Sequence, residues 1–210
     1  MSVSTLSTQN LVPGLNETVT VVHLHHHDCR IMRNALGVEA DTKVFGVTLR
    51  LSKRGSVEAV ALATPTTVFL VSFSKAGTQG STQNGASSSS GNDELRYLLG
   101  DPRCLLAGAG IARLALLLHK NTGAHVRGAE LLTLPVKPKG KQTFPADLAS
   151  NYLSSGVHHR RIHALWLRDS NNDICLRAWI LAWYVSLLCM YSSIAGCHVL
   201  LASRRGPLTR

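Results

Sequence analysis

Three consecutive β-type runs constrain the fold of this chain more than any other feature. The first, Lys43–Leu51 (KVFGVTLRL), has an apolar side chain at each odd-numbered position from 45 onward, so one side of the strand is continuously apolar. Turn residues at Lys53–Gly55 and at Pro65 separate it from the runs Ala59–Ala63 and Thr67–Ser72. Strands joined by such short turns pair with their chain neighbours. The region therefore predicts a three-stranded antiparallel meander.

The other periodic segments predict alternating strands and helices around this meander. A strand is expected before it, at Thr18–Leu24. The segments expected after it are a helix from Asn92 to Leu99, a strand at Cys104–Ala109, a helix at Ile111–Lys120, a strand within Val126–Leu134, a helix at Pro145–Leu153, an irregular basic stretch at 156–170 and a long apolar helix at Asp173–Ala202. This order predicts a mixed α/β fold with parallel strands beside the meander.

The length of 210 residues fits a single domain. Residues 1–17 are polar and contain Pro13 and Gly14, so we expect a flexible N-terminal arm. The domain proper is expected over residues 18–202, with a flexible Ser/Gly/Gln-rich insertion at 75–92, and 203–210 form a basic tail.

Charge and cysteine usage limit the function classes. The chain has 22 Lys and Arg against 12 Asp and Glu, a formal net charge of +10, which favours nucleic acid or anionic lipid as a partner. Five cysteines without CxxC spacing indicate reduced thiols, neither a disulfide framework nor a zinc site. The histidine-rich run from His23 to Cys29 is interpreted as a solvated strand end, with a transition-metal site as the less favoured alternative. No secretory signal is apparent, so we expect an intracellular protein, nuclear or cytoplasmic.

Several blocks in a fixed order carry a family resemblance. They read VFGVTLRL, VALATPTTVFLVSF, LRYLLGDPRCLLAGAGIARLALLL, HVRGAELLTL and ILAWYVSLL. In this order they resemble the DEDD-type 3′–5′ exonuclease domain, in the Werner-syndrome-like branch common in plants. The resemblance covers about residues 18–200 and implies a ribonuclease-H-like fold, a mixed sheet flanked by helices.

The same resemblance implies a metal-dependent nuclease site, but this chain lacks its ligands. The family hydrolyses a 3′-terminal phosphodiester with two Mg²⁺ or Mn²⁺ ions, held by four carboxylates, while a Tyr or His orients the attacking water. The matching positions here are Thr48, Arg50, Leu114, Ala178 and Ala182. Thr is a poor ligand and Arg is a fixed cation, so we expect no metal, no cofactor and no catalysis.

A non-catalytic domain with this charge predicts a nucleic-acid-binding or protein-interaction module, and a homo-oligomer is one form that the latter could take. Arg50 is either recruited to hold a phosphate or simply solvated. The residues expected to contact a nucleic-acid backbone are Arg50, Lys53, Arg54, Arg113, Arg160 and Arg161. A residual metal-dependent 3′–5′ exonuclease is the third alternative.

The last predicted helix leaves a rival interpretation open. No Asp, Glu, Lys or Arg occurs from Ala178 to Ala202, so the segment is long enough to span a membrane and to anchor the chain by its tail. Serines, Gly196 and His198 lower its hydrophobicity. We therefore favour a helix buried in the domain.

Overall fold

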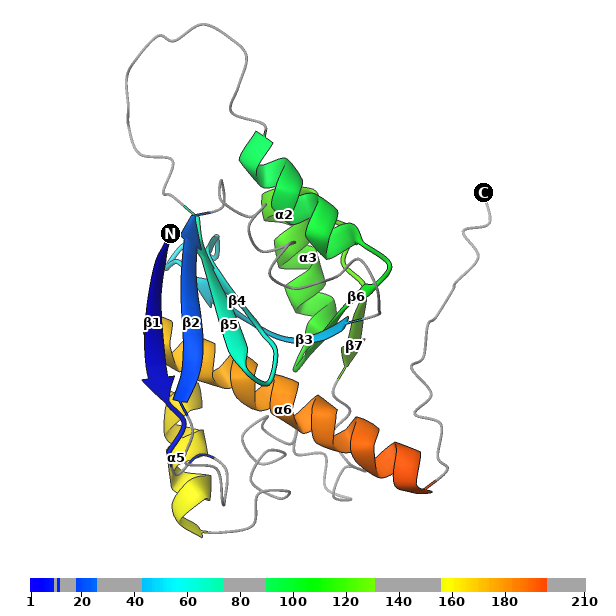
Figure 1. Ribbon diagram of the computed structural model, residues 1–210. Helices are drawn as coiled ribbons and strands as arrows, with labels where there is room; N and C mark the ends of the chain where they lie inside the picture. Colours follow the sequence, from blue (N-terminus) through cyan, green and yellow to red (C-terminus); the bar gives the residue numbers. More distant parts are fainter. Residues whose placement is uncertain (10, 12–17, 26–42, 74–89, 131–155, 196–210) are drawn as a thin grey trace, which may run out of the picture.

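The computed structural model describes residues 1–9, 11, 18–25, 43–73, 90–130 and 156–195, which form one sheet between two helical layers (Figure 1). In chain order the elements are β1 (Ser2–Ser7), β2 (Thr18–His25), β3 (Lys43–Leu51), β4 (Val57–Ala63), β5 (Thr67–Ser72), α2 (Ser90–Gly100), β6 (Cys104–Gly108), α3 (Ile111–Thr122), β7 (Gly128–Glu130), α5 (Gly156–Trp166) and α6 (Asn171–Ala195).

The sheet is mixed, as the sequence predicts. Its seven described strands lie in the order β1-β2-β5-β4-β3-β6-β7. β3, β4 and β5 are the predicted antiparallel meander. β2 adds to it parallel to β5, and β6 and β7 continue it in parallel beyond β3. These connections place β3 next to the centre of the sheet, with a neighbour on each side.

Alternation along the central strands assigns one helical layer to each face. On β4 the small residues Ala59, Ala61 and Ala63 join the core shared with α5 and α6. The intervening Val60 and Leu62 join the core shared with α2 and α3. Both faces are apolar because both are covered, which is the pattern of a buried sheet.

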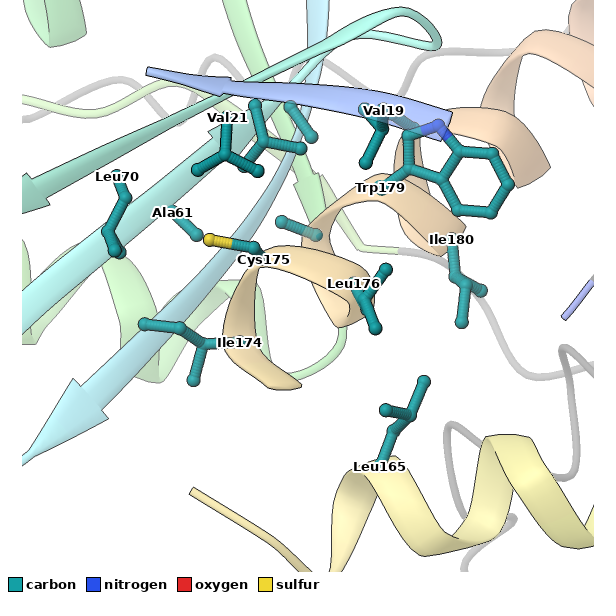
Figure 2. Close-up of a cluster of buried hydrophobic side chains, with 14 of the residues drawn as sticks. Val19, Val21, Ala61, Leu70, Leu165, Ile174, Cys175, Leu176, Trp179 and Ile180 are labelled. Atoms are coloured by element: carbon teal, nitrogen blue, oxygen red, sulfur yellow. The ribbon is translucent and has the colours of Figure 1, made fainter. Parts of the chain in front are cut away.

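The helix α6 packs directly on the sheet through its N-terminal half. Figure 2 shows Cys175 and Trp179 of α6 facing strand residues that include Val21, Ala61 and Leu70. Trp179 is 2% exposed, and its indole Nε1 donates a hydrogen bond of 2.7 Å to the Pro65 carbonyl in the β4–β5 turn. The buried-helix prediction is confirmed for this part of α6. No helix within the described ranges is long and apolar enough to cross a membrane.

The N-terminal arm is a correction. Residues 2–7 form strand β1, which pairs antiparallel with β2 from Ser2↔His23 to Ser7↔Thr18. Most of its side chains are exposed, and only Leu6 packs against the core. Backbone pairing with the edge of β2 therefore holds the strand. Residues 2–7 have no alternating apolar pattern from which the strand could be predicted.

The stretch at 156–170 is a second correction, because its first eleven residues form helix α5. Ile162 and Leu165, three residues apart, are buried in the core that α5 shares with α6, and Figure 2 shows Leu165 pointing toward α6. The run of histidines and arginines hides this helical spacing.

The remaining predicted segments are partly outside the described residues. The predicted strand in Val126–Leu134 is β7, and the helix expected from Asn92 begins two residues earlier, at Ser90. α6 is described from Asn171 to Ala195, and it begins two residues before the expected start at Asp173. Of the insertion predicted at 75–92, residues 90–92 are instead the first turn of α2, and 75–89 lie outside the described residues. The helix at Pro145–Leu153, residues 196–202 and the tail at 203–210 also lie outside them.

Candidate functional site

The candidate site lies where strand β3 meets helix α6. Phe45 and Val47 of β3 belong to the core under α2 and α3, so Gly46, Thr48 and Arg50 face α6 on the other side. Strand residues two apart share a face because the side-chain period is two. Thr48 and Arg50 therefore share a face, as the spacing predicts.

The contacts between β3 and α6 run in register along both elements. Arg50 Nη1 donates a hydrogen bond to Asn171 Oδ1, and Thr48 Oγ1 donates one of 2.6 Å to the Ile174 carbonyl. Gly46 follows, next to Ala178. Each step of two residues along the strand covers about 6.6 Å, and the matching steps of three and four residues along the helix cover about 4.5 and about 6 Å. Successive contacts therefore stay roughly aligned because β3 and α6 run in opposite directions.

Gly46 brings the two backbones into direct contact. A Cβ atom at this position would lie 2.1 Å from the Ala178 carbonyl oxygen and 2.5 Å from the Ala182 amide nitrogen. Only a residue without a side chain fits there, and Ala178 and Ala182 are each 2% exposed or less. We call this contact of Gly46, Thr48 and Arg50 with α6 the β3–α6 joint.

Four of the five positions matched to the exonuclease motifs meet in this joint, and Leu114 does not. Leu114 Cδ1 and Val47 Cγ1 each lie 3.2 Å from the Cβ position of Gly108. Leu114 is thus part of the core under α2 and α3. It packs on the sheet face opposite to that of Thr48 and Arg50.

The Arg50 guanidinium is already occupied by protein groups. Its Nε lies 3.3 Å from Glu58 Oε2 on β4, and both side chains are 26% exposed. A register shift between Arg50 and Leu51 interrupts the β3–β4 ladder beside this ion pair. Arg50 therefore joins β4 to the start of α6 through one charged and one neutral partner.

The joint does not fit the divalent metals of the resembling family. Mg²⁺ and Mn²⁺ take oxygen ligands, above all carboxylates. Here the Thr48 hydroxyl donates to the Ile174 carbonyl, and the Arg50 guanidinium has no lone pair to offer a metal. The nearby Glu58 carboxylate pairs with Arg50. Across the described ranges, no group of three or more His, Cys, Asp or Glu side chains could hold a metal ion.

The other predicted cations are exposed but do not form one cluster. Lys53 and Arg54 occupy the β3–β4 turn, in which Gly55 has a φ of 77° and Ser52 Oγ accepts the Arg54 and Ser56 amides. Arg113 lies on α3, whereas Arg160 and Arg161 lie on α5, so the sheet separates them (Figure 1).

One cation near the joint was missed by sequence reasoning. Arg168 is exposed in the turn between α5 and α6, three residues before Asn171, the partner of Arg50. The sequence pattern Ser170-x-x-Asp173 marks the start of the helix that follows this turn, so it could have placed Arg168 just before α6. Asp173 N donates to Ser170 Oγ and Ser170 N to Asp173 Oδ2, both at 3.2 Å, so the pattern is the actual start of α6.

The order of the strands in the mixed sheet and the helices on both of its faces make this a ribonuclease-H-like fold of the 3′–5′ exonuclease type. Among solved structures, Escherichia coli RNase D, an exoribonuclease involved in structured RNA processing, matches with a TM-score of 0.52 at 10% sequence identity. The match covers 82% of this chain and 45% of that one, so this chain spans less than half the length of RNase D.

A second match is to a single exonuclease domain. The EXD2 exonuclease domain soaked in Mg and GMP gives a TM-score of 0.42 at 19% identity, over 83% of this chain and 96% of that one. No protein-family model matches the sequence, and no curated protein matches it significantly. Among these comparisons, the match to a solved structure is the one that supports the fold expected from the sequence motifs.

Proposed function

We propose that this chain is a degenerate 3′–5′ exonuclease domain, similar to the Werner-like exonucleases of plants, that binds nucleic acid without cleaving it. The observation that carries the proposal is the chemistry of the β3–α6 joint. Thr48 and Arg50 stand where the motif has its Asp and Glu. A guanidinium there repels the cations that the reaction needs.

The distribution of charge supports binding to phosphates. Lys53, Arg54 and Arg168 are exposed on two turns that the Arg50–Asn171 hydrogen bond ties together, and none of the three has an ion-pair partner among the described residues. Unpaired exposed cations attract a phosphate backbone without reading its sequence. Because Arg50 is paired with Glu58 and Asn171, its role is to hold together the two turns that carry Lys53, Arg54 and Arg168.

The proposal needs no cofactor and assigns the chain an intracellular site of action, nuclear or cytoplasmic. A protein-interaction module, including a homo-oligomer, is the function that remains if nucleic acid does not bind. The tail-anchored alternative uses residues 178–202, of which 196–202 lie outside the described residues.

The test is fluorescence anisotropy of labelled single- and double-stranded DNA and RNA, titrated with the protein between about 50 and about 200 mM salt. We expect binding that weakens steeply as salt rises. The double variant Lys53→Gln/Arg54→Gln should lower the slope of log K against log salt by about 1–2 on duplex. Lys120→Gln, exposed on α3, is the matched control. Absence of binding at low salt would refute the proposal.

A further inference from the structure

A pocket opens at the C-terminal end of α2, on the sheet face opposite the β3–α6 joint. It has a volume of about 390 Å³, within the range of roughly 300–1,000 Å³ that is usual for ligand sites. Its lining residues are Arg96, Tyr97, Gly100, Asp101, Pro102 and His125.

One wall of this pocket is the exposed side of α2, and the spacing of the apolar residues on the helix determines which side that is. Leu95, Leu98 and Leu99 are buried against the sheet, so the residues between them face solvent. Tyr97 is 70% exposed, and Arg96 beside it is also exposed. An exposed aromatic ring next to a guanidinium is therefore a product of how α2 packs.

The loop that follows α3 forms the second wall. It begins at Gly123, whose φ of 71° ends the helix, and carries His125. Arg96 Cδ and Nε lie 3.9 Å from the Cβ position of Gly123, and the His125 carbonyl lies 3.9 Å from that of Gly100. The two walls thus approach each other, and Asp101 and Pro102, which follow α2, also line the pocket.

The free charge of the pocket is positive. The Asp101 carboxylate accepts hydrogen bonds of 2.9–3.0 Å from Arg103 N, Nε and Nη2, so its charge is neutralised inside the turn. Arg96 has no hydrogen-bond or ion-pair partner in the described part of the chain. The His125 ring stands against the His119 ring, with centroids 4.9 Å apart. A flat phenol, a free guanidinium and an imidazole together suit a planar ring that carries an anion.

We propose that this pocket holds one nucleotide of a single-stranded nucleic acid, with the base stacked on Tyr97 and a phosphate paired with Arg96. This inference rests on the proposed function and adds a subsite to it, remote from the β3–α6 joint. A single strand is specified because only an unpaired base exposes a face to stack. Arg pairs with phosphate through two parallel hydrogen bonds, which fixes the orientation of the nucleotide.

The test uses the full chain and adenosine 5′-monophosphate as the probe, measured by isothermal titration calorimetry. We expect the monophosphate to bind more tightly than adenosine or inorganic phosphate. Tyr97→Leu should weaken its binding about 5- to 150-fold, the range for one stacked base, whereas Tyr97→Phe should retain it. Arg96→Gln should remove the preference for the monophosphate over adenosine. Lys120→Gln, which does not line the pocket, should change nothing.

The same variants separate the two proposals when titrated with a labelled single-stranded oligonucleotide. Weaker binding by Tyr97→Leu and Arg96→Gln supports the subsite. If the oligonucleotide binds but neither substitution affects it, and the monophosphate does not bind, the subsite is refuted and the proposed function stands. If no oligonucleotide binds even at low salt, the proposed function itself is refuted.

Discussion

At the scale of single residues, three residues of β3 decide what the candidate site can do. Gly46 admits the backbone of α6, Thr48 donates to it, and Arg50 connects it to β4. Each contact uses a property of that residue type: no side chain, a short donor, and a long planar cation. Carboxylates at 48 and 50 would remove both donors and place two like charges on one face.

Gly46→Ala tests the closeness of the joint. The added methyl would start 2.1 Å from a helix carbonyl, so α6 must shift, and we expect the free energy of unfolding to fall by roughly 1–3 kcal/mol or more. Gly100→Ala is the control, because its Cβ would meet only the His125 carbonyl at 3.9 Å. Chemical denaturation of both variants makes the comparison. Equal stability of the two would contradict the direct contact of backbones.

The buried thiols give a second prediction at this scale. Burial raises the pKa of Cys175 to about 12, and burial together with the Asp101 charge raises the pKa of Cys104 to about 12. Because the thiolate is the reactive form, both should resist Ellman's reagent at pH 8 until the protein unfolds. The measurement needs a variant in which the three other cysteines are Ser. Rapid reaction of the folded variant would show that these thiols are not buried.

The same thiols predict a direction for the dependence of stability on pH. The ordinary thiol pKa of 9.0 applies to the unfolded chain, which therefore loses these protons first as the pH rises. The free energy of unfolding should be unaffected by them below about pH 8 and should decrease from about pH 9 upward. Chemical denaturation at several pH values across this range measures the decrease. The Cys104→Ala and Cys175→Ala variants should each show a smaller decrease in the free energy of unfolding.

At the scale of elements, the start of α6 positions the joint. Ser170 and Asp173 form a reciprocal cap, and Asn171 directly after Ser170 holds Arg50. The cap satisfies amides that would otherwise have no partner at the first turn. The position of the first turn, and through it the contact with Arg50, thus depends on two short polar side chains.

Removal of the cap tests this dependence. Ser170→Ala should lower the free energy of unfolding by about 1 kcal/mol, the usual cost of losing a helix cap. The neighbouring exposed Asn172 is the matched control, and Asn172→Ala should be close to neutral. Thermal unfolding monitored by circular dichroism compares the two. An unaltered midpoint for Ser170→Ala would mean that the cap does not stabilise α6.

Sequence patterns predict elements well here where apolar spacing carries the signal. Regular apolar spacing predicts β3 and α3, continuous apolar runs predict β6 and the buried part of α6, and all of these elements are present. β1 was not predictable, because Ser and Thr dominate it and its stability comes from pairing with β2. α5 was hidden by charged residues around Ile162 and Leu165.

The candidate site was only partly predictable for a related reason. The shared face of Thr48 and Arg50 follows from strand periodicity alone. The partners of Arg50 do not, since Glu58 and Asn171 lie on β4 and α6 and are brought to it only by tertiary packing. The α2 pocket likewise depends on how the loop after α3 approaches α2.

At the scale of the whole molecule, a ribonuclease-H-like fold carries a formal net charge of +10, and Gly46, Thr48 and Arg50 hold α6 closely against β3. In the proposed function, the net charge of +10 attracts a polyanion, and the exposed cations of the turns hold it. Under the proposed function, the fold supplies the binding surface and the joint supplies rigidity.

The most direct test of this account is the length of a 5′-labelled oligonucleotide after incubation with the purified protein in Mn²⁺, at concentrations where anisotropy shows binding. The account predicts that the oligonucleotide is bound and keeps its full length. Progressive shortening from the 3′ end would contradict the account. If the Arg50→Ala variant shortens the oligonucleotide equally well, residues other than Arg50 and its neighbours hold the metals.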